Sequence, residues 1–194
     1  MARPKSFNVD DALERAMNLF WTDGYERASL SDLLVAMGIQ RSSFYNTFED
    51  KRTLFLQALD AYIQRVNVEF IIATLEASTE GRDGITKVFQ DYVDHFATDA
   101  DCKGCLLVNT QVEVAPHDAE VAARIEATTT EVTAAFEQAI KRCQAAGRIK
   151  ADLDPATTAQ FLLNTLTGIR VLGRRTQQRH AFQQIVDTAL SVLG

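Results

Sequence analysis

Apolar side chains recur roughly every three or four residues along most of the chain, which is the spacing of one face of an α-helix. The first run covers residues 9–22 and is followed by a glycine at a suitable helix end. Ser29 and Asp32 have the spacing of a capping box, in which a serine opens a helix and an acidic residue bonds back to it. This second helix is expected to end at Gly38.

A short polar segment separates the second helix from a long one. Residues 41–47 are predicted to form a third helix, which carries an arginine, two serines, a tyrosine and an asparagine. Asp50 then caps a fourth helix, whose apolar positions continue to Val66. Because so short a helix must be supported by its neighbours, we predict that its polar face contacts a partner.

The second half of the chain continues the helical pattern. A polar stretch with two glycines, residues 78–84, is the best candidate for a domain boundary. Further helices are expected over residues 85–96, 106–113, 118–146, 155–174 and 178–193. No stretch shows the alternation of a half-buried strand. The pattern therefore predicts an all-α fold of about nine helices.

The composition is that of a soluble globular protein. The chain has 194 residues, of which 46% are hydrophobic and three are proline, enough for one continuous core or two modest ones. No apolar run approaches the roughly 18 residues of a membrane span, and the N-terminus carries acids where a signal peptide would be apolar. Three cysteines are too few for a disulfide scaffold, so we expect a cytoplasmic protein.

The net charge of −6 argues against nucleic acid as a partner, because nucleic-acid binders are expected to be basic at least locally. Residues 1–60 contain seven Lys and Arg against nine Asp and Glu. The positions of the cations nevertheless favour a local patch. Arg3 and Lys5 lie in an arm without acids, and Arg41 and Lys51 flank the short polar helix.

Two short helices joined through Gly38 and Ile39 form the pattern of a helix-turn-helix, in which the first helix braces the second and the second enters the major groove of DNA. Apolar residues on both helices would fill the angle between them. Arg41 can reach guanine edges through two hydrogen bonds, whereas the hydroxyl groups, Tyr45 and Lys51 suit phosphate oxygens. An ordinary connector with a solvated polar face is the alternative interpretation.

The stretch LFWTDGYERASLSDLLVAMGIQRSSFYNTFEDKRTLF, residues 19–55, resembles the N-terminal domain of the TetR (TetR/AcrR) family of bacterial transcriptional regulators. The residues that carry the resemblance in particular are Gly24, Tyr25, Ser29, Gly38, Tyr45, Phe48 and Lys51. It implies that operator DNA is contacted by Ser29, Arg41, Ser42, Ser43, Tyr45, Asn46 and Lys51. The sequence departs from the family at Gln40, where a serine or a similar cap is usual.

The resemblance also implies two domains with different tasks. A helix-turn-helix DNA-binding domain would occupy residues 1–55, with a linking helix over 50–75, and a helical domain for dimerisation and inducer binding would occupy residues 56–194. The last two helices match the pair that forms a four-helix bundle across the two-fold axis of the family's homodimers. Both are apolar over more than one stripe, which a lone surface helix would not tolerate.

Cys102 and Cys105 form a C-x-x-C pair, which can be a redox couple, half of a zinc site or a chance pattern. A thioredoxin-like site would need strands that the pattern lacks, and zinc would need further ligands. Cys105 stands where a helix begins, beside Lys103, and both features would favour its thiolate. A redox sensor at Cys105 or Cys102 and a small buried side chain are both open interpretations, and Cys143 is expected in the core.

The second domain offers candidates for an inducer cavity that is mostly apolar with a few orienting polar groups. These candidates are Phe89, Tyr92, Phe96, Val108, Gln111, Phe136, Ile140, Phe161 and Asn164. Helical aromatic residues are more often simply core residues, which is the alternative for most of them.

Together these observations predict a homodimeric one-component regulator, a repressor that binds a palindromic double-stranded operator and is released by a small-molecule inducer or by cysteine modification. We expect no enzyme activity, because the chain lacks a nucleophile triad, a phosphate loop and paired carboxylates. We also expect no cofactor, no metal and no membrane association. The alternatives are a thiol-disulfide or peroxide-reducing enzyme that uses Cys102 and Cys105, and a ligand-binding helical module whose DNA-binding head has decayed.

Overall fold

A computed structural model describes residues 7–79 and 81–194, so the basic arm with Arg3 and Lys5 lies outside the described residues. The helices are α1 (Val9–Asp23), α2 (Leu30–Met37), α3 (Arg41–Phe48), α4 (Lys51–Ile63), the π-helix η1 (Gln64–Ile72), α5 (Ala73–Ala77), α6 (Arg82–Thr98), α7 (Leu106–Glu113), α8 (Ala119–Ala145), α9 (Pro155–Leu172) and α10 (Arg179–Ser191). Helices α4, η1 and α5 follow one another without interruption. The described residues therefore form nine helical rods and no strand, which confirms the predicted all-α fold.

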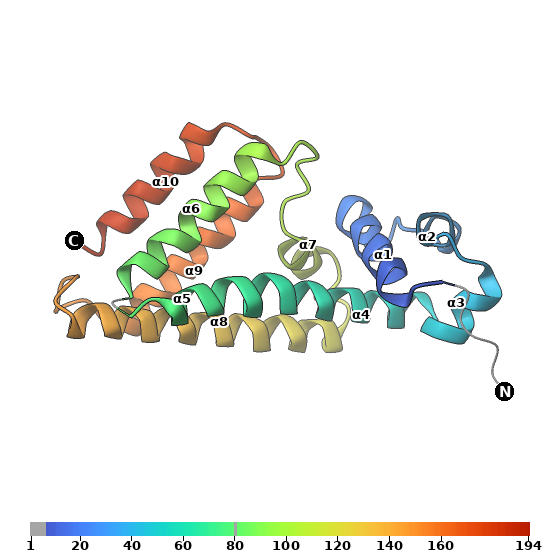
Figure 1. Ribbon diagram of the computed structural model, residues 1–194, viewed down its shortest axis with the longest axis horizontal. Helices are drawn as coiled ribbons and strands as arrows, with labels where there is room; N and C mark the ends of the chain where they lie inside the picture. Colours follow the sequence, from blue (N-terminus) through green and yellow to red (C-terminus); the bar gives the residue numbers. More distant parts are fainter. Residues whose placement is uncertain (1–6, 80) are drawn as a thin grey trace.

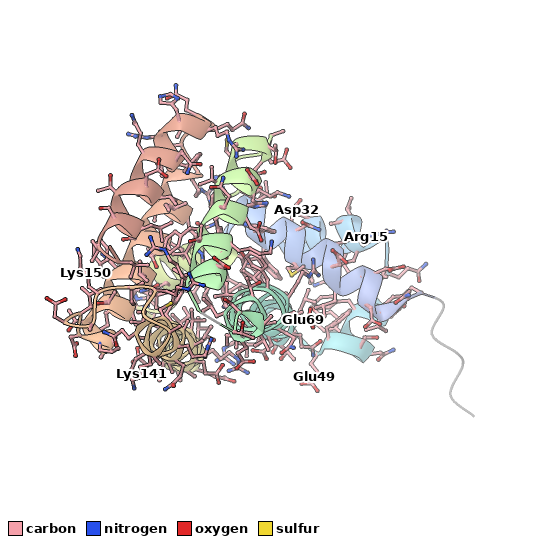
Figure 2. The ribbon with its side chains drawn as sticks, turned by 60° about the vertical axis from the view of Figure 1, so that its left-hand side comes forward. Arg15, Asp32, Glu49, Glu69, Lys141 and Lys150 are labelled. Carbon is pink, nitrogen blue, oxygen red and sulfur yellow. The ribbon has the colours of Figure 1, made fainter. Side chains whose placement is uncertain are left out.

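The molecule is elongated, with α1, α2 and α3 at one end and α6, α9 and α10 at the other (Figure 1). The rod α4–η1–α5 and the long helix α8 run beside each other and connect the two ends (Figure 1). Charged side chains such as those of Glu49, Lys141 and Lys150 lie on the outside of the assembled helices (Figure 2). No helix in the described parts of the chain has the length and apolar character that crossing a bilayer requires.

The buried side chains form two hydrophobic clusters rather than one. The first contains the apolar faces of α1–α4, and the second contains those of α6, α9, α10 and the C-terminal part of α8. The first cluster also takes in α7 and the beginning of α8, through residues such as Leu106, Val114 and Val121. The predicted division at residues 55 and 56 stays a prediction, because packing of the first cluster crosses it.

The helix ends follow the local signals in the sequence. Ser29 and Asp32 form the predicted capping box, in which the Ser29 hydroxyl accepts from the Asp32 amide and the Asp32 carboxylate accepts from the Ser29 amide. Asp50 caps α4 by accepting from the Thr53 amide at 2.7 Å. Gln40 precedes α3 without a side-chain cap, so the first backbone N–H groups of α3 lack that partner.

The π-helix η1 was not expected from the hydrophobic pattern. Its wider turn alters which side chains face inward, because a π-helix bonds each residue to the fifth one along. Asn67 is thereby buried, although an asparagine is rarely found fully buried. Such segments occur frequently at functional sites, and η1 lies where two cavities meet the linking rod.

Candidate nucleic-acid interface and regulatory cavities

Helices α2 and α3 form the turn of a helix-turn-helix through Gly38. This residue has φ 68° and ψ 32°, a left-handed conformation that glycine adopts without steric cost. The amide of Gly38 donates to the Val35 carbonyl and that of Ile39 to the Leu34 carbonyl, each at 3.2 Å, which closes the end of α2. The turn thus sets the angle at which α3 leaves α2.

Helix α3 separates its residues cleanly into two faces. Phe44 and Phe48 are fully buried and pack against each other with ring centroids 6.0 Å apart. Arg41 and Tyr45 are exposed on the other face, where the guanidinium lies 5.8 Å from the tyrosine ring centroid. Ser42 and Asn46 share this exposure, and Ser43 is half-buried. The structure therefore brings the predicted α3 residues together on one solvent-facing surface.

The other two predicted DNA-binding residues lie beside α3 and already have partners within the chain. Ser29 is exposed, but its hydroxyl is engaged in the capping box of α2. The ammonium group of Lys51 lies 4.5 Å from the ring centroid of Tyr25 and donates to the Glu26 carbonyl at 3.5 Å. Lys51 is half-buried. Through these two contacts it joins the α1–α2 turn to the start of α4.

Helix α7 contacts this DNA-binding end directly through Glu113. Its carboxylate accepts from the backbone amides of Tyr25 and Glu26, at 3.1 and 3.0 Å, in the turn that follows α1. Gly24 has φ 86°, and a Cβ at that position would come within 2.7 Å of Glu113 Oε2. The absence of a side chain at Gly24 therefore permits the close approach of the carboxylate. Sequence reasoning missed Glu113, because its partners lie far away in the chain.

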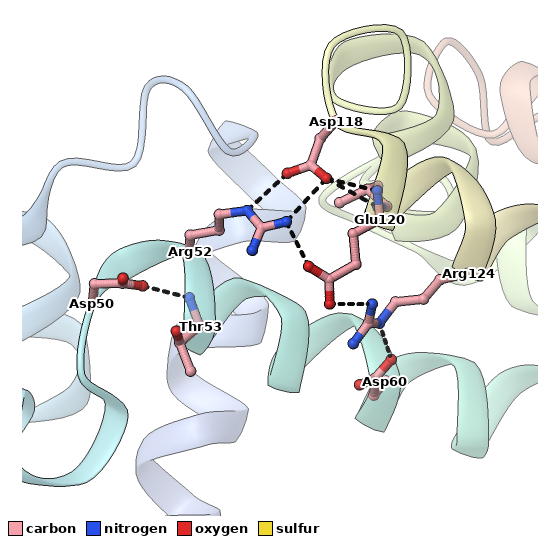
Figure 3. A network of polar contacts seen from close by, with 8 residues as sticks. Asp50, Arg52, Thr53, Asp60, Asp118, Glu120 and Arg124 are labelled. Carbon is pink, nitrogen blue, oxygen red and sulfur yellow. Dashed lines mark hydrogen bonds and ion pairs between the residues drawn. The ribbon is translucent and has the colours of Figure 1, made fainter.

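A second connection joins α4 to α8 through charged groups (Figure 3). Arg52 donates to Asp118 at 2.9 Å and to Glu120 at 2.7 Å, and Arg124 bridges Glu120 and Asp60. The bonds from Arg52 hold the pKa of Asp118 down at about 2. These groups are largely exposed, so the network orients the two helices more than it stabilises the fold.

Two cavities are lined by residues of η1, and the larger of these two has a volume of about 600 Å³ and lies among η1, α7, α8 and α9. Three predicted ligand residues, Val108, Gln111 and Asn164, line it. Its walls also contain two residues that sequence reasoning missed, Asn67 and Arg170, and both are buried. The sequence does show that Arg170 stands among apolar residues of one helix. The pattern alone does not show that this arginine faces a cavity.

The smaller cavity, of about 360 Å³, lies between α1, the linking rod and α6. Tyr92, Phe96 and Cys105 line it. Tyr62 donates its hydroxyl hydrogen to Cys105 Sγ at 3.3 Å, and Arg170 Nη2 donates to the Tyr92 hydroxyl at 2.6 Å. Burial raises the pKa of both tyrosines, so both hydroxyls are neutral at physiological pH.

Four of the predicted ligand residues lie elsewhere than in either of these cavities. Phe89, Phe136 and Ile140 are fully buried in the second cluster, where they act as core residues. Phe161 is 42% exposed and lines a groove between α9 and α10 on the outside of the molecule. Helix packing thus distributes the nine residues over the core, two cavities and the surface, and their role in ligand binding stays a prediction.

The three cysteines are free and occupy different surroundings. Cys105 is the N-cap of α7 and is buried, whereas Cys102 is half-buried in the preceding loop with φ 49°. Lys103 pairs with Asp101 and lies over the Trp21 ring, at 5.1 Å from its centroid. Cys143 is buried in the second cluster, and burial raises the pKa of its thiol.

Helices α9 and α10 carry an apolar face that no described part of the chain covers. Phe161, Val171, Ile185 and Val192 are each more than a third exposed on these two helices. Phe161 and Ile185 line the groove between α9 and α10, which also includes Leu172 and Ala189. Single exposed apolar residues are ordinary, whereas exposed apolar residues that share one groove suit a surface that another molecule covers.

A turn-linked helix with an exposed polar face, joined to a helical domain that contains cavities, defines a one-component transcriptional regulator of the helix-turn-helix class. The chain belongs to the TetR family of such regulators. Residues 12–58 match the family model "Bacterial regulatory proteins, tetR family", and residues 81–189 match "Tetracyclin repressor-like, C-terminal domain".

Individual relatives agree with this assignment. "Uncharacterized HTH-type transcriptional regulator YezE" of Bacillus subtilis (strain 168) is 32% identical over 194 residues and covers both chains completely. "HTH-type transcriptional repressor ComR" of Escherichia coli (strain K12) is 30% identical, over 97% of this chain and 90% of its own. A cysteine mutant of the TetR family regulator CifR, solved with 26-bp double-strand operator DNA, is 31% identical with a TM-score of 0.87, and the match covers 99% of this chain and 100% of that chain. No relative named here supports the thiol-disulfide enzyme.

Proposed function

We propose that this chain is a homodimeric repressor that binds a palindromic operator through α3 and releases it when an effector occupies the second domain. The observation that carries the proposal is the geometry of α3. Its apolar side chains are buried to 0% exposure at Phe44 and Phe48, while Arg41, Ser42, Tyr45 and Asn46 remain free on one face. Such a rigidly supported polar face suits the major groove, and CifR, at 31% identity, was solved on operator DNA.

Each predicted contact has a distinct role in this proposal. Arg41 would read a guanine, and Tyr45, Asn46 and the serine hydroxyls would reach bases or phosphates. Lys51 and Ser29 would act near the phosphates, where their present bonds already fix their positions. The amides at the start of α3, which lack a side-chain cap, suit a phosphate oxygen. The working compartment would be the cytoplasm, where the chromosome of a bacterium lies.

Dimerisation would occur through α9 and α10, whose uncovered apolar face is described above. A two-fold dimer would present two copies of α3, which must lie about 34 Å apart to enter successive major grooves. An effector can release DNA only if it binds more tightly to the conformation in which this spacing is wrong.

The effector signal would pass through α7. This helix lines the larger cavity with Leu107, Val108 and Gln111, and it ends at Glu113, which holds the turn after α1. A small movement of α7 would therefore move the α1–α2 turn. Modification of Cys105 is a second route to the same movement, because this cysteine caps α7 and borders the smaller cavity. Cys102, in the loop before it, would be the resolving partner.

Fluorescence anisotropy tests the proposal with a labelled duplex that contains an inverted repeat from upstream of the gene. We expect specific binding in the range of about 10⁻⁸–10⁻¹¹ M that weakens steeply as salt rises, and much weaker binding to a scrambled duplex. Light scattering should give twice the chain mass of 21.6 kDa. Equal affinity for both duplexes, or no binding at low salt, would refute the proposed function.

A further inference from the structure

The larger cavity is lined by two buried residues that each carry a donor atom without a hydrogen-bond partner. Asn67 is 2% exposed and Arg170 is 3% exposed, and both line the cavity. Within the described residues, Asn67 Nδ2 and Arg170 Nε have no partner. Buried polar groups are nearly always paired, so each unpaired donor in a cavity wall indicates a missing acceptor.

The charge of Arg170 is also uncompensated. Its Nη2 atom donates to the Tyr92 hydroxyl, and its guanidinium lies 4.9 Å from the centroid of that ring. No ion pair in the described part of the chain involves Arg170. Tyr62 and Tyr92 are neutral at physiological pH because burial raises their pKa. Buried cations normally have an anionic partner, and the residues that the structure describes provide none for Arg170.

The remaining cavity wall combines apolar and neutral polar groups. Leu107, Val108 and Leu163 supply apolar surface. Hydroxyl and amide groups come from Thr128, Thr167, Gln111 and Asn164. Two carboxylates on α8 also border the cavity. Glu126 is exposed to solvent and Glu137 pairs with Lys141, so Arg170 is the one charged side chain that is fully buried among the described residues.

We propose that this cavity binds a small organic carboxylate, whose headgroup pairs with Arg170 and whose apolar part lies against Leu107, Val108 and Leu163. Asn67 supplies a further donor to the same molecule, from the π-helix that turns it inward. A charged acceptor explains both the unpaired Nε–H and the uncompensated charge, whereas a neutral ligand explains only the first. This inference names the chemical class of the effector and therefore rests on the proposed function.

The test compares carboxylates with their neutral amides, which have nearly the same shape. Purified full-length protein is titrated with benzoate and hexanoate and with benzamide and hexanamide, by calorimetry and by thermal unfolding. We expect each carboxylate to bind at least about tenfold more tightly than its amide and to raise the Tm, since a ligand of the native state stabilises it. Equal binding of acid and amide, or no binding by either, would overturn the inference.

Two arginine variants assign the preference to the cavity. Arg170→Met should abolish the difference between acid and amide. Arg142→Met is the matched control, because Arg142 is also partly buried with an unpaired Nε but bonds to the Leu75 carbonyl and does not line the cavity. It should keep the full preference. Retention of the preference by a folded Arg170→Met protein would contradict the inference.

Asn67→Leu provides an independent check if Arg170→Met fails to fold. It removes the second donor, and we expect it to weaken benzoate binding several-fold and benzamide binding less, because a hydrogen bond to an ionised acceptor is stronger than one to a neutral carbonyl. Unaltered benzoate binding would show that Asn67 does not contact the ligand, and it would count against the inference. Operator binding by the ligand-free protein is measured separately. Its absence would refute the proposed function, whereas an absent preference for carboxylates refutes only this inference.

Discussion

The two regions of this protein, helices α1–α4 and the helices from η1 to α10, differ in where their polar side chains lie. Among the described residues of helices α1–α4, no charged, amide, serine or threonine side chain is fully buried, and the buried Tyr62 hydroxyl of α4 is directed to Cys105 of the other region. The fully buried charged, amide and threonine side chains of the described part of the chain all belong to the other region, and they are Asn67, Thr110, Thr128, Thr158 and Arg170.

The difference follows from where each region meets its partner. DNA is too large to enter a protein, so the groups that read it must project from a rigid support. A small molecule is enclosed, so the groups that orient it lie inside and carry a desolvation cost when the cavity is empty. Four predictions test this contrast.

The largest effect is expected from removing the support of α3. Phe44→Ala should destabilise the protein by about 3–5 kcal/mol, because it removes a fully buried ring from the first cluster. The adjacent change Tyr45→Ala is the control and should cost no more than about 1 kcal/mol, because that ring is 45% exposed and loses its edge-to-face contact with Phe44. Urea unfolding measures both. Similar losses for the two variants would show that α3 does not separate a buried face from a free one.

Removal of the free face should give the opposite result. We expect Arg41→Ala combined with Tyr45→Ala to weaken operator binding by about 2–4 kcal/mol, because two contacts to DNA are lost, and to lower the urea midpoint no more than Tyr45→Ala alone does. Gln57→Ala, an exposed polar residue on α4, is the control and should bind DNA as the unmodified protein does. Fluorescence anisotropy with the same duplex measures the operator affinity of both variants. Full operator affinity in the double variant would show that this face does not contact DNA.

A smaller effect is expected at the turn between the two helices. Gly38→Ala should destabilise by about 1 kcal/mol, because alanine is disfavoured at φ 68°. Gln57→Ala, on the exposed face of α4, is the control and should change the stability by no more than about 0.5 kcal/mol. Thermal unfolding measures both changes. A stabilised Gly38→Ala protein would mean that the turn is not held in the left-handed conformation.

The smallest effect concerns the ionic connection between the two regions. The folded-state pKa of Asp118 is about 2, below its ordinary value of about 3.9. A lowered carboxyl pKa contributes stability that is present above about pH 4 and is lost as the pH falls through 2. Asp118→Asn should therefore reduce the acid sensitivity of the Tm in that window and leave its trend between pH 6 and 8 unchanged. An identical acid profile in the variant would show that the Arg52–Asp118 bond has no role in stability.

Local signals in the sequence were sufficient to predict where the helices lie and which face of α3 is exposed. The capping box at Ser29, the glycine at 38 and the Asp50 cap each act over a few residues, so their positions follow from the chain alone. The outward direction of Arg41 and Tyr45 also follows from the 3.6-residue period, once Phe44 and Phe48 face inward.

The cavity residues could not be found in the same way. Phe89, Phe136 and Phe161 have the same helical spacing pattern in the sequence, yet two are core residues and the third is on the surface. Helical period shows which side chains share a face, but it does not show which neighbour covers that face. The assignment depends on contacts between helices far apart in the chain, such as those of α8 with α9.

The sequence by itself determined an all-α chain with a short polar helix held on an apolar support, because caps, turns and amphipathic period are local properties. Only the tertiary structure decided that Glu113 holds the turn after α1, that η1 turns Asn67 inward and that Arg170 bonds to Tyr92 and to no acid among the described residues. The physical reason is that burial and pairing of a polar group depend on which distant segments surround it, and these are set when the helices pack together.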